Sequence, residues 1–241
     1  MMIYWRPGRQ RGLRELYRGF IAPGDVVFDV GAHLGDRTRA FAALGARVVA
    51  LEPQPQLLPW LHLWAGRLPG VTLVAQAVGA VPGEAQLAVS RRNPTVSSLS
   101  EAWRQGVQER QEGFRGVRWD GDVRVGVTTL DLLVEEFGIP SFCKIDVEGF
   151  EEEVLKGLSQ AIPALSVEFV AGDLRGALAC VRRMEALGPY EFNVIPGEER
   201  SFLLPDWTPP SVMKAWLESG AGGFPSGDLY ARLRRGSGPA R

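Results

Sequence analysis

The first residues with a chemical signature lie where a short apolar run, residues 26–30, passes into a helical pattern. Asp29, Gly31 and Gly35 occupy this junction. Glycines here let the backbone turn tightly and approach a bound molecule, and unpaired N–H groups at a helix start suit a carboxylate or phosphate. Glu52 follows 21 residues after Gly31, at the end of the next apolar run, where a carboxylate can accept hydrogen bonds from both hydroxyls of an adenosine ribose. The spacing indicates an adenosyl or dinucleotide cofactor, against the plainer alternatives of a tight turn and a solvated acid.

A second group of charged residues ends another apolar run. Lys144, Asp146 and Glu148 stand at alternate positions, so in an extended strand they share one face. Three charges are costly to bury unless they pair, so one interpretation is an ion pair of Lys144 with Asp146 or Glu148 that organises the sheet edge. The other interpretation makes one carboxylate a general base. Together with Glu168 the two acids could also bind Mg²⁺, but we expect no metal, because acids at strand ends are common without one.

The rest of the chain predicts the scaffold that positions these groups. Short runs rich in Val and Ile alternate with helical patterns of about ten residues, which is typical of βαβ units on a parallel sheet. The last two strands are expected to form an antiparallel pair at one edge. The predicted strands are residues 26–30, 48–51, 71–75, 123–127, 142–146, 164–169, 190–195 and 201–204, with an accessory strand at 84–89. The predicted helices are residues 38–44, 56–67, 129–137, 150–158 and 174–187.

The composition is that of an ordinary soluble globular protein: 241 residues, 45% hydrophobic and 23% charged. A net charge of −1 provides no field that would attract nucleic acid. The apolar runs are too short to span a bilayer, and the Arg-rich N-terminus lacks the apolar stretch of a signal peptide. We therefore expect a cytoplasmic protein with no nucleic-acid or membrane partner. The two cysteines, Cys143 and Cys180, suit core positions rather than disulfides or zinc.

One main domain is expected at residues 23–205, after a helical lead-in at 1–22 and before an extension and frayed tail at 206–241. Residues 91–122 break the alternation of strands and helices, because they are polar and dotted with aromatic residues, and we interpret them as a lid or insertion. Aromatic and guanidinium groups in this segment could stack a ring or hold an anionic group. These groups are Trp103, Trp119, Arg115 and Arg118.

Five runs of residues together carry a resemblance to a known family. They are FDVGAHLGDRT (28–38), ALEPQP (50–55), AVG (77–79), TTLD (128–131) and KIDVEGFEEEVLKG (144–157). In order and spacing, over residues 26–169, they resemble the FkbM-type family of S-adenosylmethionine-dependent methyltransferases. The resemblance implies the class I, Rossmann-like methyltransferase fold: a mostly parallel seven-stranded α/β sheet with an antiparallel edge strand and helices on both faces. It also implies a hydroxyl acceptor on a sugar, a polyketide or another small metabolite.

The resemblance also assigns residues to the cofactor, S-adenosyl-L-methionine. Asp29 would orient the first loop and the methionine amino group, and Glu52 would hold the ribose. His33 departs from the family, where asparagine is commoner at this place; an imidazole can still make one hydrogen bond there. A pair of adjacent serines, at 97 and 98, resembles a stretch that precedes the family's lid. The full cofactor set is Asp29, Gly31, His33, Gly35, Thr38, Glu52, Gln76 and Ala77.

The predicted activity is methyl transfer to a hydroxyl oxygen of a small molecule or glycan, with Asp146, Lys144 and Glu148 as the catalytic candidates. A sulfonium methyl is already a good electrophile, so the enzyme mainly aligns the hydroxyl and removes one proton. Two rival hypotheses are weaker. A dinucleotide-dependent oxidoreductase predicts a third glycine near the helix start, where residues 36–38 read Asp-Arg-Thr. A non-catalytic binding module predicts that the cofactor residues have been lost, but in this chain they are present.

Overall fold

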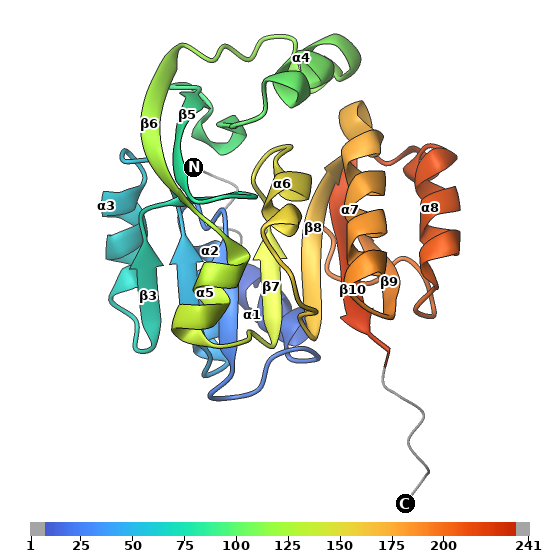
Figure 1. Ribbon diagram of the computed structural model, residues 1–241, viewed down its shortest axis with the longest axis horizontal. Coiled ribbons are helices and arrows are strands. Elements are labelled where there is room, and N and C mark those ends of the chain that lie inside the picture. The colour runs from blue at the N-terminus through green and yellow to red at the C-terminus, as the bar shows by residue number, and fades with distance from the viewer. Residues whose placement is uncertain (1–7, 235–241) are drawn as a thin grey trace, which may run out of the picture.

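Seven strands form the central sheet in the order β3-β2-β1-β7-β8-β10-β9 (Figure 1). This computed structural model describes residues 8–234, so the start of the predicted lead-in and the predicted frayed tail lie outside the described residues. The sheet confirms the predicted α/β fold class. Its strands are β1 (Val26–Val30), β2 (Arg47–Leu51), β3 (Val71–Val74), β7 (Phe142–Ile145), β8 (Ala164–Val170), β9 (Tyr190–Pro196) and β10 (Ser226–Leu233).

The strand directions bring the carboxyl ends of neighbouring strands to one edge of the sheet. β3, β2, β1, β7 and β8 run parallel, and β10 runs antiparallel between β8 and β9. The register pairs Asp29 of β1 with Ala50 of β2 and with Lys144 of β7. Residues just beyond these strands therefore meet at the point where the strand order reverses, which is where open α/β sheets bind ligands.

Helices cover both faces of the sheet, as predicted. One face carries α5 (Leu130–Phe137), α6 (Glu151–Lys156), α7 (Leu174–Leu187) and α8 (Pro210–Glu218). The other face carries α1 (Arg9–Tyr17), α2 (Asp36–Ala43) and α3 (Leu58–Leu61), which continues as a π-helical turn at His62–Gly66. Side chains of β1 alternate between the layers, with Phe28 toward α5–α8 and Val27 toward α1 and α2. Within residues 8–234, no helix is long and apolar enough to cross a membrane.

A smaller sheet and helix α4 stand above the carboxyl edge of the main sheet (Figure 1). This sheet has the order β4-β6-β5 and consists of β4 (Ala77–Val78), β5 (Gly83–Val89) and β6 (Gly121–Thr128). The predicted accessory strand is β5, and the strand predicted at 123–127 is β6 of the smaller sheet. The predicted insertion contains α4 (Glu101–Arg110) and 3₁₀ turns at Pro94–Val96 and Glu112–Phe114. Its elements therefore cover the carboxyl edge of the main sheet, where the candidate residues lie.

The prediction for the last strand is wrong. Residues 201–204 form no strand, and the antiparallel partner of β9 is β10 instead. The reason is burial: Leu203 is 39% exposed, whereas Leu229 of β10 is fully buried between β8 and β9. The segment 206–241, predicted as an extension and tail, thus contributes α8 and a strand to the main sheet.

The hydrogen bonds of Tyr190, in the edge strand β9, lead to a prediction about stability. The Tyr190 hydroxyl in β9 accepts a hydrogen bond from Ile162 N at 2.9 Å and donates one to Ile162 O at 2.6 Å. Tyr190→Phe leaves both buried backbone groups without that partner, so we expect it to lower the free energy of unfolding by about 1–3 kcal/mol in urea titrations. The matched control is Tyr230→Phe, because Tyr230 is equally buried but its hydroxyl has only a 3.4 Å contact with Tyr17. Equal losses in the two variants would contradict the prediction.

Candidate active site

The loop after β1 is folded tightly against the loop after β7. Gly31 has a φ of +83°, and a Cβ atom there would lie 1.9 Å from the carbonyl oxygen of Asp146, so only glycine fits. Asp29 and Thr38 hold this loop from the protein side: the Thr38 hydroxyl donates to Asp29 Oδ2 at 2.5 Å, and both side chains are buried. The Asp29 carboxylate is therefore a support for the loop and does not line the adjoining pocket.

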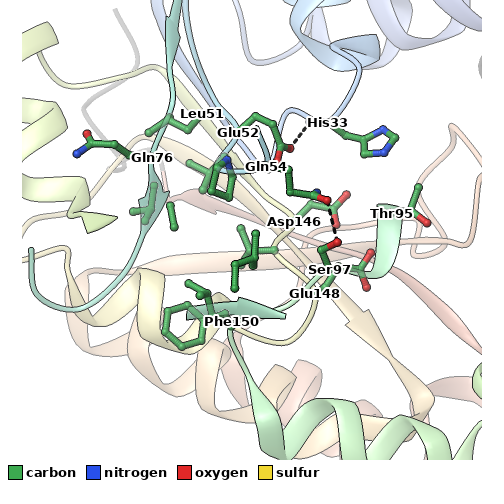
Figure 2. Close-up of a pocket in the computed structure, with 18 residues that line it drawn as sticks. His33, Leu51, Glu52, Gln54, Gln76, Thr95, Ser97, Asp146, Glu148 and Phe150 are labelled. Carbon is green, nitrogen blue, oxygen red and sulfur yellow. Dashed lines mark hydrogen bonds between the residues drawn. The ribbon is translucent and has the colours of Figure 1, made fainter. Parts of the chain in front are cut away.

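Glu52 closes β2 and faces the same loop (Figure 2). Its Oε2 accepts a hydrogen bond from the backbone N–H of His33 at 2.9 Å, and its Oε1 accepts one from Gln54 N at 2.9 Å. The side chain is 2% exposed. Burial raises the pKa of Glu52 to about 7, although the two backbone donors oppose the shift. Glu52 is thus a buried carboxyl that changes charge near neutral pH.

A pocket opens between Glu52 and the end of β7 (Figure 2). It encloses about 730 Å³ of empty space, part of it open to solvent. Its apolar lining includes Leu51, Val78, Leu87, Leu99 and Phe150. Its polar lining comes from His33, Glu52, Gln54, Gln76, Thr95, Ser97, Asp146 and Glu148. A ligand with a flat apolar part and a polar, hydroxylated part suits such a lining.

An ion pair between a buried lysine and a partly exposed aspartate lies at the end of β7. Lys144 Nζ is 2.6 Å from Asp146 Oδ2, and Lys144 is 2% exposed. Burial alone would lower the pKa of Lys144, but the charge of Asp146 raises it instead. Burial likewise opposes ionisation of Asp146, and the ammonium of Lys144 outweighs it and lowers the pKa of that carboxyl. The ion-pair interpretation and the general-base interpretation are therefore compatible. Lys144 pairs with Asp146, and this pairing favours an ionised Asp146 at the pocket wall.

Two further acids surround Asp146. Oxygens of Asp146, Glu148 and Glu168 all lie within 4.8 Å of one another. Burial first, and then the charge of Asp146, raise the pKa values of Glu148 and Glu168 well above the ordinary value. These two carboxyls thus tend to keep their protons, which makes them hydrogen-bond donors toward a neighbouring oxygen. The Lys144 ammonium thus favours the ionised form of Asp146, whereas burial and the charge of Asp146 favour the protonated forms of Glu148 and Glu168.

The pocket and the acids lie within a segment that matches a known family. The profile of the methyltransferase FkbM domain matches residues 29–175, which is more than half of the chain. The chain belongs to the FkbM methyltransferase family.

Relatives with curated names are also methyltransferases. Hexuronic acid methyltransferase AglP of Haloferax volcanii is 27% identical over 179 residues, which cover 72% of this chain and 67% of that protein. Ribosomal RNA small subunit methyltransferase A of Phenylobacterium zucineum is 40% identical over 80 residues, which cover 33% of this chain and 27% of that protein. Among solved structures, precorrin-6y C5,15-methyltransferase of Geobacter metallireducens is 16% identical, with a TM-score of 0.47, and the match covers 94% of this chain and 86% of that one.

The insertion of this methyltransferase is fastened to the turn after β7. Glu148 and Gly149 both have positive φ, +56° and +84°. Glu148 is not glycine, so this conformation carries strain that neighbouring groups must hold. The Ser98 hydroxyl donates to the carbonyl oxygen of Glu148 at 2.6 Å, and the Trp103 ring lies so close to Gly149 that a Cβ there would be 2.0 Å from Trp103 Cγ. The insertion thus sets the position of the Glu148 carboxyl.

The neighbouring serine of the insertion makes a contact on the other side of the pocket. The Ser97 hydroxyl donates to Gln54 Oε1 at 2.8 Å (Figure 2), and Gln54 N donates in turn to Glu52. Gln54 was not predicted as a site residue. Its position two residues after Glu52, in the turn that follows β2, was the available signal. Ser97 and Ser98 together connect the insertion to both ends of the site.

The structure brings most of the predicted site residues together, but not all. The predicted residues that line the pocket are Gly31, His33, Glu52, Gln76, Ala77, Asp146 and Glu148. The predicted residues that do not line it are Asp29, Gly35, Thr38 and Lys144. Of the predicted contacts in the insertion, Trp103 is 3% exposed and packs on Gly149. The Trp119 indole donates to Val96 O, and Arg115 and Arg118 line a different hollow.

The contact between Trp103 and Gly149 can be tested by adding a single methyl group. Gly149→Ala forces a Cβ atom into the Trp103 ring, so we expect it to lower the free energy of unfolding by about 1–3 kcal/mol more than a strain-only control. The control is Gly220→Ala, because Gly220 also has a positive φ, +97°, but nothing lies within 4 Å of its Cβ position. Urea titration followed by tryptophan fluorescence measures both. A loss in Gly149→Ala no larger than in Gly220→Ala would show that the contact is not tight.

Proposed function

We propose that this chain transfers the methyl group of S-adenosyl-L-methionine to a hydroxyl oxygen of a small molecule or glycan. The observation that carries the proposal is a single pocket that joins the buried carboxyl of Glu52, at the end of β2, to the ionised Asp146 beyond β7. The name of the relative AglP, a hexuronic acid methyltransferase, supports a sugar as acceptor. The expectation that the acceptor is not a nucleic acid rests on the net charge of −1.

The residues of the pocket fit the cofactor. Gly31 lines the pocket, and its lack of a side chain lets the first loop pack against the loop after β7. The carboxylate of Glu52 accepts backbone N–H groups from His33 and Gln54, and a carboxylate has enough lone pairs to accept ribose hydroxyls as well. The apolar residues of the lining suit the adenine ring, and Gln76 and Ala77, just after β3, line the same pocket. Asp29 and Thr38 serve by holding the loop rather than by contact.

When bound, the cofactor supplies a methyl group on a positively charged sulfur, and the sulfur leaves with the electrons of the broken C–S bond. The protein must align a hydroxyl oxygen with that bond and receive its proton. Asp146 receives the proton in this proposal, because Lys144 keeps its carboxylate ionised. A carboxylate is a weak base toward an alcohol, so alignment provides most of the rate. Glu148 and Glu168 hold the acceptor oxygen by donating hydrogen bonds.

No metal takes part in this proposal. Asp146, Glu148 and Glu168 are grouped closely enough to ligate a divalent cation. Lys144 already supplies a positive charge at 2.6 Å from Asp146, however, and protons on the other two carboxyls relieve their repulsion. The alternative predicts an activity that depends on Mg²⁺.

Cofactor binding by calorimetry tests the role of Glu52. Because the pKa of Glu52 is about 7 in the protein alone, its proton must leave before both oxygens can accept ribose hydroxyls. We therefore expect the affinity for S-adenosyl-L-methionine to rise from pH 6 to pH 8. Glu52→Gln should weaken binding at pH 8 by about 1–3 kcal/mol and flatten that pH dependence. Glu135→Gln, an exposed matched change, should leave both unchanged. Unaltered affinity in Glu52→Gln would remove this residue from the site.

Asp146→Asn separates chemistry from binding. Loss of the proton acceptor should lower kcat by about 100-fold or more, while the calorimetric affinity for the cofactor stays within about twofold of wild type, because Glu52 and the first loop are intact. Retained cofactor binding also reports that the variant is folded. Turnover equal to wild type would refute the role of Asp146. Loss of activity in EDTA, restored by Mg²⁺, would replace the proton-acceptor role with a metal-ligand role.

A further inference from the structure

A hollow in the insertion is lined mainly by polar and charged side chains, half of them arginines. Its walls come from the segment after β5 and from the segment before β6, which leave the same end of the smaller sheet because Val89 pairs with Gly121. The hollow encloses about 1170 Å³ of empty space, part of it open to solvent. We call it the arginine hollow, and its lining consists of Arg92, Asn93, Arg115, Gly116, Arg118 and Asp120.

Hydrogen bonds hold the two walls of the arginine hollow together. Asp120 N donates to Val89 O at 3.1 Å, and Arg91 N donates to Asp120 Oδ1 at 3.0 Å. The Trp119 indole donates to Val96 O at 2.8 Å. The backbone that carries the arginines is therefore held on both sides, so a ligand that binds between the walls has to order less of the chain than it would in a free loop.

The arginine hollow has more positive charge than its own acid offsets. The hydrogen bond from Arg91 N, followed by the charges of Arg91 and Arg92, lowers the pKa of Asp120, so this carboxylate is ionised and already engaged by one wall. On the other wall, no residue from 8 to 234 forms an ion pair or a side-chain hydrogen bond with Arg115 or Arg118. Like charges that share one hollow repel each other, and a bound anion would offset this repulsion.

The shape of the arginine side chain favours a phosphate group over a carboxylate in this hollow. Each guanidinium is a planar fork that donates two parallel hydrogen bonds to an oxyanion. A phosphate group has three acceptor oxygens that point in different directions, so forks from opposite walls can bind it at the same time. Asn93 adds a side-chain amide to the lining, and nothing lies within 4 Å of the Cβ position of Gly116, which leaves space between the walls.

We propose that the arginine hollow binds a phosphate or diphosphate group. This site goes beyond the proposed methyl transfer, which uses none of these arginines. The hollow lies close to the pocket between Glu52 and Asp146, because Asn93 lines the hollow and Thr95, two residues later, lines that pocket. The Cα atoms of residues two apart are separated by at most about 7 Å. The phosphate therefore has two sources that the test must separate, the molecule that is methylated and a free ion.

Calorimetric titration of the full chain with inorganic pyrophosphate tests the site at low ionic strength, where charge interactions are least screened. We expect saturable binding that weakens as salt is added. Arg115→Gln combined with Arg118→Gln should lower the affinity by at least about tenfold, because two charge-assisted contacts are lost. The matched control combines Arg39→Gln with Arg182→Gln, because these arginines are exposed on α2 and α7, outside the hollow. Thermal unfolding reports that both double variants are folded.

Three outcomes would overturn the proposal. The first is that the wild-type chain binds no pyrophosphate, whether or not it binds an RNA oligomer. The second is an equal loss of affinity in the two double variants. The third is that malonate, which carries two carboxylates, binds as tightly as inorganic phosphate, because charge alone would then decide the binding. The pyrophosphate titration contains no cofactor, so its result does not depend on the proposed function.

A second titration separates the two sources of the phosphate. The probes are glucose 1-phosphate and inorganic phosphate, each added to the full chain in the presence of S-adenosylhomocysteine. Tighter binding of the sugar phosphate, lost when Arg115 and Arg118 are both replaced by Gln, would assign the group to a larger molecule that also contacts the neighbouring pocket. Equal or weaker binding of the sugar phosphate would assign the hollow to a free ion. Either result supports a phosphate site, whereas binding of both probes that is unchanged in that double variant would refute it.

Discussion

The site depends on one close contact between two backbone loops. The loop after β1 passes so near the loop after β7 that Gly31 has no room for a side chain beside the carbonyl oxygen of Asp146. This contact places the candidate cofactor loop directly against the residue that we propose receives the proton. Because β1 and β7 are neighbouring parallel strands in register, the sheet itself enforces the approach. The pocket, the acids and the insertion above them are arranged around this contact between the two loops.

The site also depends on how the charges of its carboxyl groups are offset. Three carboxyls grouped at the end of a sheet and partly withdrawn from solvent repel one another when all of them are ionised. Lys144 offsets one charge with a buried ammonium, and burial keeps protons on Glu148 and Glu168. The outcome is an asymmetric set in which one carboxylate is ionised and its neighbours can donate. Such pairs of acids held in different protonation states are typical of sites that move protons.

The insertion contributes to both halves of the site. Ser97 contacts Gln54 beside Glu52, and Ser98 contacts the strained turn that carries Glu148. Two adjacent residues thus tie the candidate ribose site to the carboxyl cluster. A segment held at these points is a fixed wall of the site.

The amino-acid sequence was enough to predict the fold class, the ranges of the parallel strands along the chain and the group of residues at the strand ends, including Asp146, Glu148 and Glu168. These features depend on local patterns: the period of apolar residues marks strands and helices, and glycines or acids directly after a strand lie at its carboxyl end in any parallel sheet. Glu52 and Asp146 were found in this way. The three-dimensional arrangement was needed to show that β10 lies between β8 and β9, that Ser97 of the insertion contacts Gln54, and that the Asp29 carboxylate accepts from Thr38 and does not line the pocket. Those outcomes depend on which distant segments compete for the same buried surface, and the repeat pattern of a single segment carries no information about its competitors.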